Sequence, residues 1–214
     1  MIEWMIHYFA RLFGRPSLVG EAAKPEGVIV SEPQSWKPFE GPLAHIPIGR
    51  TSMIATYGDP DVSYDKAGRV IVSKKWANEV GITIAASLIP GYDKRIWMHK
   101  LTAPYFREAM RRSVERCPDY KFKTIGCFAP RHQRHDKTLP LSDHTWAIAF
   151  DINSDKNKGF YRKADDPAPF HDDWIRFSDL PEGVVEAWES VGFEWGGRWT
   201  HFCDPMHFSL RKTL

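Results

Sequence analysis

Two short polar clusters constrain the fold of this chain more than any other feature of its 214 residues. The first cluster contains His144 and Asp151, and the second contains Asp204 and His207. His144, Asp151 and His207 would supply two imidazoles and one carboxylate to a metal ion and leave a fourth position open for water. Three protein ligands and an open position are typical of a catalytic zinc site, whereas structural zinc sites are closed. The chain must therefore fold so that two distant segments meet.

A second carboxylate, Asp204, stands three residues before His207. A bound zinc ion lowers the pKa of a water molecule that it holds, and a nearby carboxylate can accept the proton of that water. We therefore expect Asp204 to act as a general base and to pass the proton to the leaving amine.

The spacing within each cluster predicts local geometry. His144 and Asp151 are seven residues apart, a separation of roughly 23 Å along an extended strand. Both side chains can reach one ion only if the chain turns between them, so we expect His144 in a loop and Asp151 in the strand after it. Asp204 and His207 would point to opposite faces of a regular strand. Pro205 interrupts regular pairing, and the turn that it favours brings both side chains to one side.

The ordered motifs support a family resemblance. The pattern S-x-H-x-x-(G)-x-A-x-D, followed by W-G-G-x-W and then D-x-x-H-F, resembles the zinc D-alanyl-D-alanine carboxypeptidase and L-alanyl-D-glutamate endopeptidase family, which includes several phage endolysins. The resemblance spans roughly residues 95–210. It implies one Zn²⁺ per chain held by His144, Asp151 and His207, and it implies that Asp204 is the catalytic carboxylate.

The resemblance also implies a catalytic arginine. Members of the family use an arginine upstream of the first zinc histidine to hold the substrate carbonyl, and Arg131 is the best match, with Arg134 a weaker candidate. Ala147 stands where the family usually has glycine. Its extra methyl group is expected to narrow the floor of the site.

Other residues near the motifs have alternative interpretations. His201 and Cys203 are potential ligands, but we expect them to face the core or to surround the ligands. His132 and His135 are expected in a solvated basic loop or along the substrate cleft, and Asp143 is expected to be a solvated neighbour of His144. Trp146 and Trp199 are candidates for the cleft wall.

Composition predicts an ordinary globular enzyme domain. Apolar residues make up 43% of the chain, charged residues make up 26%, and the formal net charge is only +2. Such a small net charge implies no strong field for nucleic acid or a membrane surface. The expected partner is therefore the peptidoglycan stem peptide that the resemblance implies, and not a nucleic acid.

Cysteine usage and hydropathy bear on the compartment. Cys117, Cys127 and Cys203 show no C-x-x-C spacing, so we expect no disulfide framework and folding in a reducing compartment. The chain contains no run of 18 apolar residues, so we expect no transmembrane span. The N-terminus lacks a basic n-region and carries Glu3, so we expect no signal peptide. We then expect the protein to be made in the cytoplasm and to reach the cell wall through another system, such as phage lysis or a virion.

The chain is predicted to divide at residue 47. Residues 1–47 comprise an amphipathic helix over residues 2–13 and a Pro-rich connection over residues 24–47, and residues 48–214 form the catalytic domain. The helix either packs on its own domain or serves as a docking or membrane-surface helix.

Within the catalytic domain we expect an α+β fold: a small antiparallel sheet with flanking helices. The resemblance implies the architecture shared by these peptidases and the Hedgehog signalling domain. Thr102 is expected to cap a helix that runs to about Arg116, and a capping box at residues 179–182 is expected to start a second helix. The expected strands cover residues 95–98, 122–128, 146–152, 193–195 and 206–210. A loop over the cleft is expected at residues 153–174.

The resemblance thus implies a zinc peptidase that acts on the stem peptide of peptidoglycan. An aspartate at the base position resembles the phage endopeptidases, which slightly favours cleavage of the L-alanyl-D-glutamate bond. The first alternative is a D-alanyl-D-alanine carboxypeptidase or dipeptidase. The second is a non-catalytic zinc-bearing module that binds the wall or belongs to a phage structure.

Overall fold

The computed structural model describes residues 36–85, 89, 92–162 and 178–213. These residues belong to the compact unit Trp36–Leu214. The predicted helix over residues 2–13 lies outside the described residues, as do the first part of the Pro-rich connection and the second half of the predicted loop over the cleft. The division at residue 47 therefore stays a prediction.

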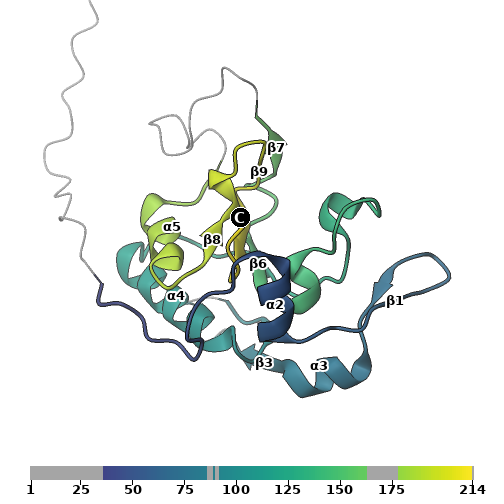
Figure 1. The fold of residues 1–214 in the computed structure, drawn as a ribbon. Coiled ribbons are helices and arrows are strands. Elements are labelled where there is room, and N and C mark those ends of the chain that lie inside the picture. The colour runs from purple at the N-terminus through teal and green to yellow at the C-terminus, as the bar shows by residue number, and fades with distance from the viewer. Residues whose placement is uncertain (1–35, 86–88, 90–91, 163–177, 214) are drawn as a thin grey trace, which may run out of the picture. The chain divides into compact units, whose positions relative to one another are not determined.

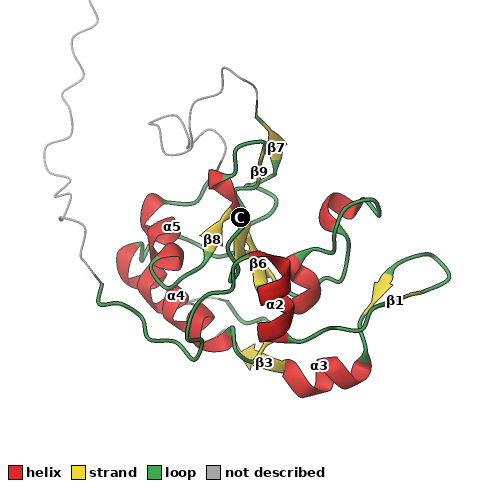
Figure 2. Cartoon of the chain, in the orientation of Figure 1, coloured by secondary structure: helices red, strands yellow, loops and turns green. Residues whose placement is uncertain are grey.

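Short helices and strands alternate along this unit, with long loops between them (Figures 1 and 2). The helices are α2 (Gly49–Tyr57), α3 (Lys74–Val80), α4 (Ala103–Arg116) and α5 (Glu182–Glu189), with 3₁₀ turns η1 (Gln133–His135), η2 (Asp143–Trp146) and η4 (Gly196–Arg198). The strands are β1 (Ser63–Tyr64), β2 (Val70–Ile71), β3 (Gly81–Ala85), β4 (Arg95–His99), β5 (Ile125–Gly126), β6 (Ala149–Ile152), β7 (Phe160–Tyr161), β8 (Glu194–Trp195), β9 (Phe202–Cys203) and β10 (His207–Ser209).

The central sheet has the strand order β5-β6-β10-β8, and its neighbouring strands are antiparallel. The remaining described strands form three two-stranded antiparallel sheets: β1-β2, β3-β4 and β7-β9. Helices α4 and α5 lie side by side next to the central sheet (Figure 1). Small antiparallel sheets with flanking helices confirm the predicted α+β class.

Side chains alternate between the two faces of β6 and β10, the middle strands of the central sheet, so one face packs in the core and the other carries the site. Phe150 on β6 and Phe208 on β10 are fully buried, and they contact Phe106 of α4 and Trp188 of α5. Burial of each such side chain stabilises the fold by roughly 1.5–3 kcal/mol. Because side chains alternate along a strand, the neighbouring residues project from the opposite face. The face turned away from α4 and α5 is therefore free to carry the polar residues of the site.

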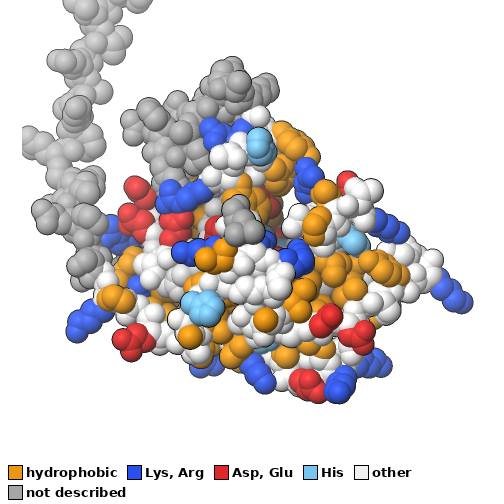
Figure 3. Space-filling view, viewed as in Figure 1, with side chains coloured by type: hydrophobic (Ala, Val, Ile, Leu, Met, Phe, Trp, Pro, Cys, Tyr) orange, Lys and Arg blue, Asp and Glu red, His pale blue; other side chains and the backbone are white. Residues whose placement is uncertain are grey.

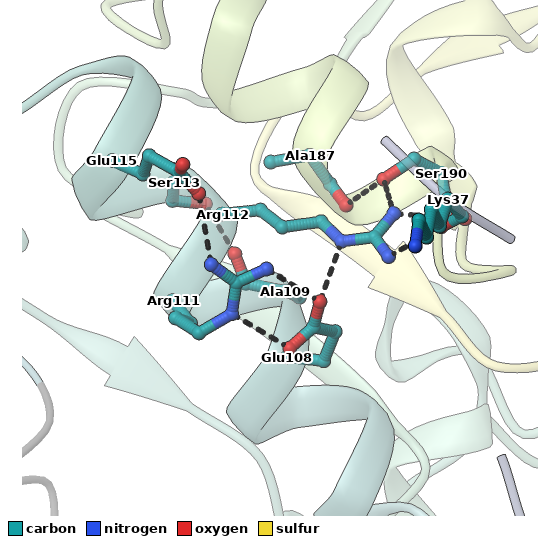
Figure 4. A network of polar contacts seen from close by, with 9 residues as sticks. All are labelled: Lys37, Glu108, Ala109, Arg111, Arg112, Ser113, Glu115, Ala187 and Ser190. Atoms are coloured by element: carbon teal, nitrogen blue, oxygen red, sulfur yellow. Dashed lines mark hydrogen bonds and ion pairs between the residues drawn. The ribbon is translucent and has the colours of Figure 1, made fainter. Parts of the chain in front are cut away.

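A buried arginine joins the two helices (Figure 4). Arg112 of α4 is 4% exposed and donates to Glu108 Oε1 (2.8 Å), Ser190 Oγ (2.9 Å) and the carbonyl of Lys37 (2.9 Å). Its guanidinium also lies 5.3 Å from the ring of Trp36. These contacts, with Phe39, Leu43 and Ile46 packed against the core, attach the described part of the Pro-rich connection to the main unit.

The secondary-structure predictions hold for element type and are less accurate at element ends. The predicted strand at residues 95–98 and helix to Arg116 are present as β4 and α4, but the Thr102 hydroxyl makes no capping bond and is buried without a partner. Helix α5 begins after Pro181 without a side-chain cap, so the predicted capping box is absent. The strands expected at residues 122–128 and 146–152 are shorter than predicted, and Trp146 belongs to η2 in place of the second strand.

Surface charge is mixed. Lysine and arginine side chains are scattered over the face in Figure 3 among acidic and apolar ones. Among the described residues, no helix combines the length and the apolar character that crossing a membrane requires. No disulfide joins the three cysteines, all of which lie in the described part of the chain.

Candidate metal centre

Three predicted ligands meet at the face of the central sheet opposite α4 and α5. Asp151 on β6 and His207 on β10 are direct partners in the strand register, and His144 reaches them from η2. His144 Nε2 lies 3.0 Å from Asp151 Oδ1 and 3.2 Å from His207 Nδ1, and His207 Nδ1 lies 3.2 Å from Asp151 Oδ1. Each residue thus offers one ligand atom, and all three atoms lie within 4.8 Å of one another.

Local sequence explains how His144 reaches the strands. Ser142 caps the 3₁₀ turn by accepting a hydrogen bond from the His144 backbone N–H (3.4 Å). Ala147 ends the turn in the left-handed region, with φ 54° and ψ 40°. This conformation favours glycine, which accounts for the glycine usual at this position in the resembled family. The Ala147 side chain is fully buried in the core and is not among the residues that line the cleft described below.

The hydrogen-bond partners of His144 require a proton or a metal ion between its ring and Asp151. The Nδ1–H of His144 donates to the carbonyl of Cys127 at 2.6 Å, so a neutral His144 has only a lone pair at Nε2. That lone pair faces Asp151 Oδ1, which as a carboxylate oxygen is also only an acceptor. Two acceptors at 3.0 Å repel each other unless a proton or a metal ion lies between them.

The donor set and spacing fit zinc. Two imidazoles and one carboxylate are a common ligand set of catalytic zinc. Zinc–ligand bonds of about 2.0–2.1 Å give a tetrahedron whose edges are about 3.3–3.4 Å. The three observed separations of 3.0–3.2 Å are slightly shorter, so a small outward movement of the side chains accommodates the ion.

The electrostatics of the cluster favour a cation as well. Burial would raise the pKa of Asp151, but hydrogen bonds and charge interactions with His144 and His207 outweigh burial and hold that pKa well below its ordinary value. Burial would lower the pKa of His207, yet the contact with Asp151 leaves it raised. The pocket therefore stabilises positive charge beside the Asp151 carboxylate.

Asp204 lies beside this cluster without being part of it. The His207 N–H donates to the Asp204 carbonyl at 3.0 Å, which is the predicted turn through Pro205. Asp204 Oδ1 is buried and has no hydrogen-bond partner among the described residues. Burial, with the added charge of Asp151, raises the pKa of Asp204 despite the opposing effect of His207. A carboxyl group with a raised pKa is suited to general acid–base chemistry near neutral pH.

The W-G-G-x-W motif has a packing role that the sequence alone does not reveal. A Cβ on Gly196 would lie 2.7 Å from the Asp204 carbonyl oxygen and 3.2 Å from the Cβ atoms of both Asp204 and His207. The Trp195 ring covers Gly197, and its Nε1 donates to the Pro205 carbonyl at 2.7 Å. The absence of side chains at both glycines therefore lets η4 pack directly beneath the turn that carries Asp204 and His207.

A cleft of about 600 Å³ opens at the cluster. A volume in this range suits a small ligand or part of a peptide. Asp204 and His207 line the cleft together with Arg131, Arg134 and Trp199. Their convergence on one cleft places acid–base, metal-ligating and cationic groups around the same space.

The two candidate arginines have different surroundings. Arg131 Nη2 lies 3.4 Å from Asp151 Oδ2, so its guanidinium is next to the proposed ligands. Arg134 donates to the Tyr161 hydroxyl and lies over the rings of Tyr161 and Phe202 at 5.6 and 5.9 Å. Arg131 is therefore the closer of the two to the proposed metal ligands.

Some of the other predictions about neighbouring residues are wrong, and others agree with the structure. Asp143 is not solvated but 4% exposed, because it pairs with Arg211 at 2.9 Å. His201 is exposed along the cleft and does not face the core, whereas Cys203 is buried as expected. His132 bonds to Tyr64 and to the Leu139 carbonyl, and His135 is exposed. Of the two tryptophans, Trp199 lines the cleft, but Trp146 lies in the core.

This arrangement defines a candidate metallohydrolase centre: a metal-ligand triad beside a carboxyl group with a raised pKa. A family model described as D-alanyl-D-alanine carboxypeptidase matches residues 135–210. The matched segment contains His144, Asp151, Asp204 and His207, and it confirms the family resemblance over the part of the chain that carries the site. Arg131 lies just outside it. Neither the curated proteins nor the solved structures include a match to this chain.

Proposed function

We propose that this protein is a zinc-dependent peptidase that hydrolyses the stem peptide of bacterial peptidoglycan, with a preference for the L-alanyl-D-glutamate bond. The observation that carries the proposal is the convergence of His144, Asp151 and His207 inside the segment that matches a peptidase family, with Asp204 and His207 lining one cleft. The aspartate at the base position favours the endopeptidase reaction.

The residues divide the chemistry among them. When bound, zinc supplies a Lewis acid that polarises the scissile carbonyl and makes a water molecule more acidic. Asp204 accepts the proton of the attacking water and donates it to the departing amine. Arg131 donates hydrogen bonds to the carbonyl oxygen as negative charge develops on it, a role for which a fixed cation close to the reacting atoms is suited.

The role of His144 Nδ1 is to hold the ring. Its hydrogen bond to the Cys127 carbonyl fixes the tautomer and directs Nε2 toward the other ligands. Partners of this kind orient metal-binding histidines and increase their basicity. The chain thus prepares the ligand geometry before the ion binds.

A second candidate function is a D-alanyl-D-alanine carboxypeptidase, favoured by the description of the matching family. Mass spectrometry of the fragments released from purified peptidoglycan separates the two reactions. The endopeptidase releases peptides that begin at D-glutamate, whereas the carboxypeptidase releases only the terminal D-alanine. A non-catalytic wall-binding module would release neither product.

Two variants test the site assignment itself. Protein purified with added zinc is expected to hold one ion per chain, and His207→Ala is expected to lose it. Asp204→Asn is expected to keep the zinc but to lose about 10²–10⁴-fold in turnover, because the residue is proposed as a base and not as a ligand. Near-normal turnover in Asp204→Asn would assign the base to another group, and loss of zinc would make Asp204 a ligand.

A further inference from the structure

Three side chains next to the metal ligands form a buried network. Asp143 directly precedes His144, and its Oδ2 accepts hydrogen bonds from Ser209 Oγ at 2.7 Å and from Arg211 Nε at 2.9 Å. Asp143, Ser209 and Arg211 are 4%, 2% and 9% exposed, so water competes little for these bonds. The network links η2, which carries one ligand, to the strand segment that carries another.

The strand pattern explains why these partners meet. Phe208 and Leu210 are fully buried in the core with α4 and α5. Because side chains alternate along a strand, His207 and Ser209 of β10 project from the other face, and Arg211 follows two residues after the end of the strand. The shared contact of Ser209 and Arg211 with Asp143 Oδ2 places them on the side from which His207 reaches His144.

The same two segments thus meet at two adjacent points. At one point His144 Nε2 and His207 Nδ1 lie 3.2 Å apart, and at the other Asp143 holds Ser209 and Arg211. We propose that Asp143, Ser209 and Arg211 form a positioning group that sets the spacing between His144 and His207 and thereby the affinity and geometry of the metal site. This inference rests on the metal site of the proposed function.

A purely stabilising role would be a weaker explanation of this network. A buried ion pair often contributes little net stability, because the cost of removing both charges from water offsets their attraction. Groups that orient metal ligands, in contrast, commonly change metal affinity by about 10–100-fold when they are removed. Measurements of metal affinity and of protein stability in the same variants therefore distinguish a positioning role from a purely stabilising one.

The test uses the full-length protein and two site variants. Ser209→Ala removes one hydrogen bond and keeps the ion pair. The double variant Asp143→Asn with Arg211→Gln removes both charges together, so that neither charge is left buried alone. The control is Ser190→Ala: Ser190 lies at the end of α5, and its Oγ also accepts a hydrogen bond from a buried arginine, Arg112, at 2.9 Å (Figure 4).

Three quantities are measured: zinc affinity by competition with a chromophoric chelator, the visible spectrum of the cobalt-substituted protein, and the Tm of the metal-free protein. We expect the site variants to bind zinc about 10–100-fold more weakly and to change the cobalt spectrum. The control is expected to leave zinc affinity and the cobalt spectrum unchanged, whatever its effect on Tm.

The outcomes distinguish this inference from the function on which it rests. If the wild type binds no zinc, the proposed function and the inference both fail. If the wild type binds zinc and cleaves peptidoglycan, but the site variants match the control in affinity and spectrum, only the inference fails. Weaker zinc binding in the control as well would show that general loss of stability lowers the affinity, and would overturn the positioning role.

Discussion

Mild acid is expected to destabilise the metal-free protein through one buried histidine, His99. This residue ends β4 and is 1% exposed, between the rings of Tyr57 and Trp76 at 5.1 and 6.3 Å. The Leu101 N–H donates to His99 Nδ1 at 3.1 Å, so the ring carries its proton at Nε2 and donates it to the Tyr57 carbonyl at 3.2 Å. A second proton would have to replace the hydrogen bond from Leu101.

The magnitude comes from the pKa of His99. Burial lowers it from 6.5 to about 4, aided by the nearby charge of Lys100 and opposed by the bond to Tyr57. Between pH 6.5 and about pH 4, His99 is therefore protonated in the unfolded chain and neutral in the folded chain. The contribution of His99 to the free energy of unfolding is fully present above the pKa of the unfolded chain. As the pH falls through this window the contribution is lost, by about 2 kcal/mol at pH 5 and about 3 kcal/mol in all.

The assay compares unfolding free energies in urea at about pH 7.5 and about pH 5 for the wild type and for His99→Gln. Glutamine keeps an N–H donor but does not titrate in this range. His207 has a raised pKa and acts in the opposite direction, so the difference between the two proteins isolates His99. We expect His99→Gln to be less sensitive to acid than the wild type by about 2 kcal/mol.

A matched control is His45→Gln, which removes an exposed histidine and is expected to keep the pH dependence of the wild type. The reasoning is refuted if His99→Gln loses as much stability on acidification as the wild type does. It is also refuted if His45→Gln alone removes the effect.

Three further predictions concern the site. Gly196→Ala should weaken zinc binding and lower kcat by about 10²-fold, since its Cβ would displace Asp204 and His207; unchanged zinc affinity in a metal titration would contradict this. Arg131→Lys should recover only part of the kcat that Arg131→Ala loses, about 3–4 kcal/mol in activation free energy, and a silent Arg131→Ala would remove this arginine from the mechanism. Ala147→Gly should change the free energy of unfolding by less than about 1 kcal/mol. Relief of the left-handed backbone stabilises the variant, whereas loss of the buried methyl group and the greater freedom of the unfolded chain destabilise it. A measured loss above about 2 kcal/mol would show that packing of the methyl group dominates.

The sequence predicts the secondary-structure elements well wherever apolar periodicity is strong. The spacing of Phe106, Met110 and Val114 predicts one buried face for helix α4. Phe106 and Met110 are buried, but the next turn buries Arg112 and Ser113 in place of Val114. Periodicity cannot reveal that Arg112 finds Glu108, Ser190 and the Lys37 carbonyl, since these partners come from different parts of the chain. The predicted element ends are wrong for a similar reason: the caps expected from local residue types are absent.

The positioning group has a partial signal in the sequence. Polar residues at His207, Ser209 and Arg211 alternate with Phe208 and Leu210, and this pattern is typical of a strand with one polar face. The pattern indicates that Ser209 and Arg211 share the face of His207. It does not indicate their partner, which is the buried Asp143 and not solvent.

The sequence by itself determined the chemistry that this protein has available: the two imidazoles, the carboxylates and their order in two motifs that resemble one peptidase family. Those assignments depend on residue type and short spacing, which are local properties. Only the tertiary structure decided which groups meet. The pairing of β6 with β10 places Asp151 opposite His207, and η2 brings His144 to both. Burial then raises the pKa of Asp204, whereas contacts with the two histidines lower that of Asp151, because desolvation and charge interactions depend on neighbours that the folded chain brings together.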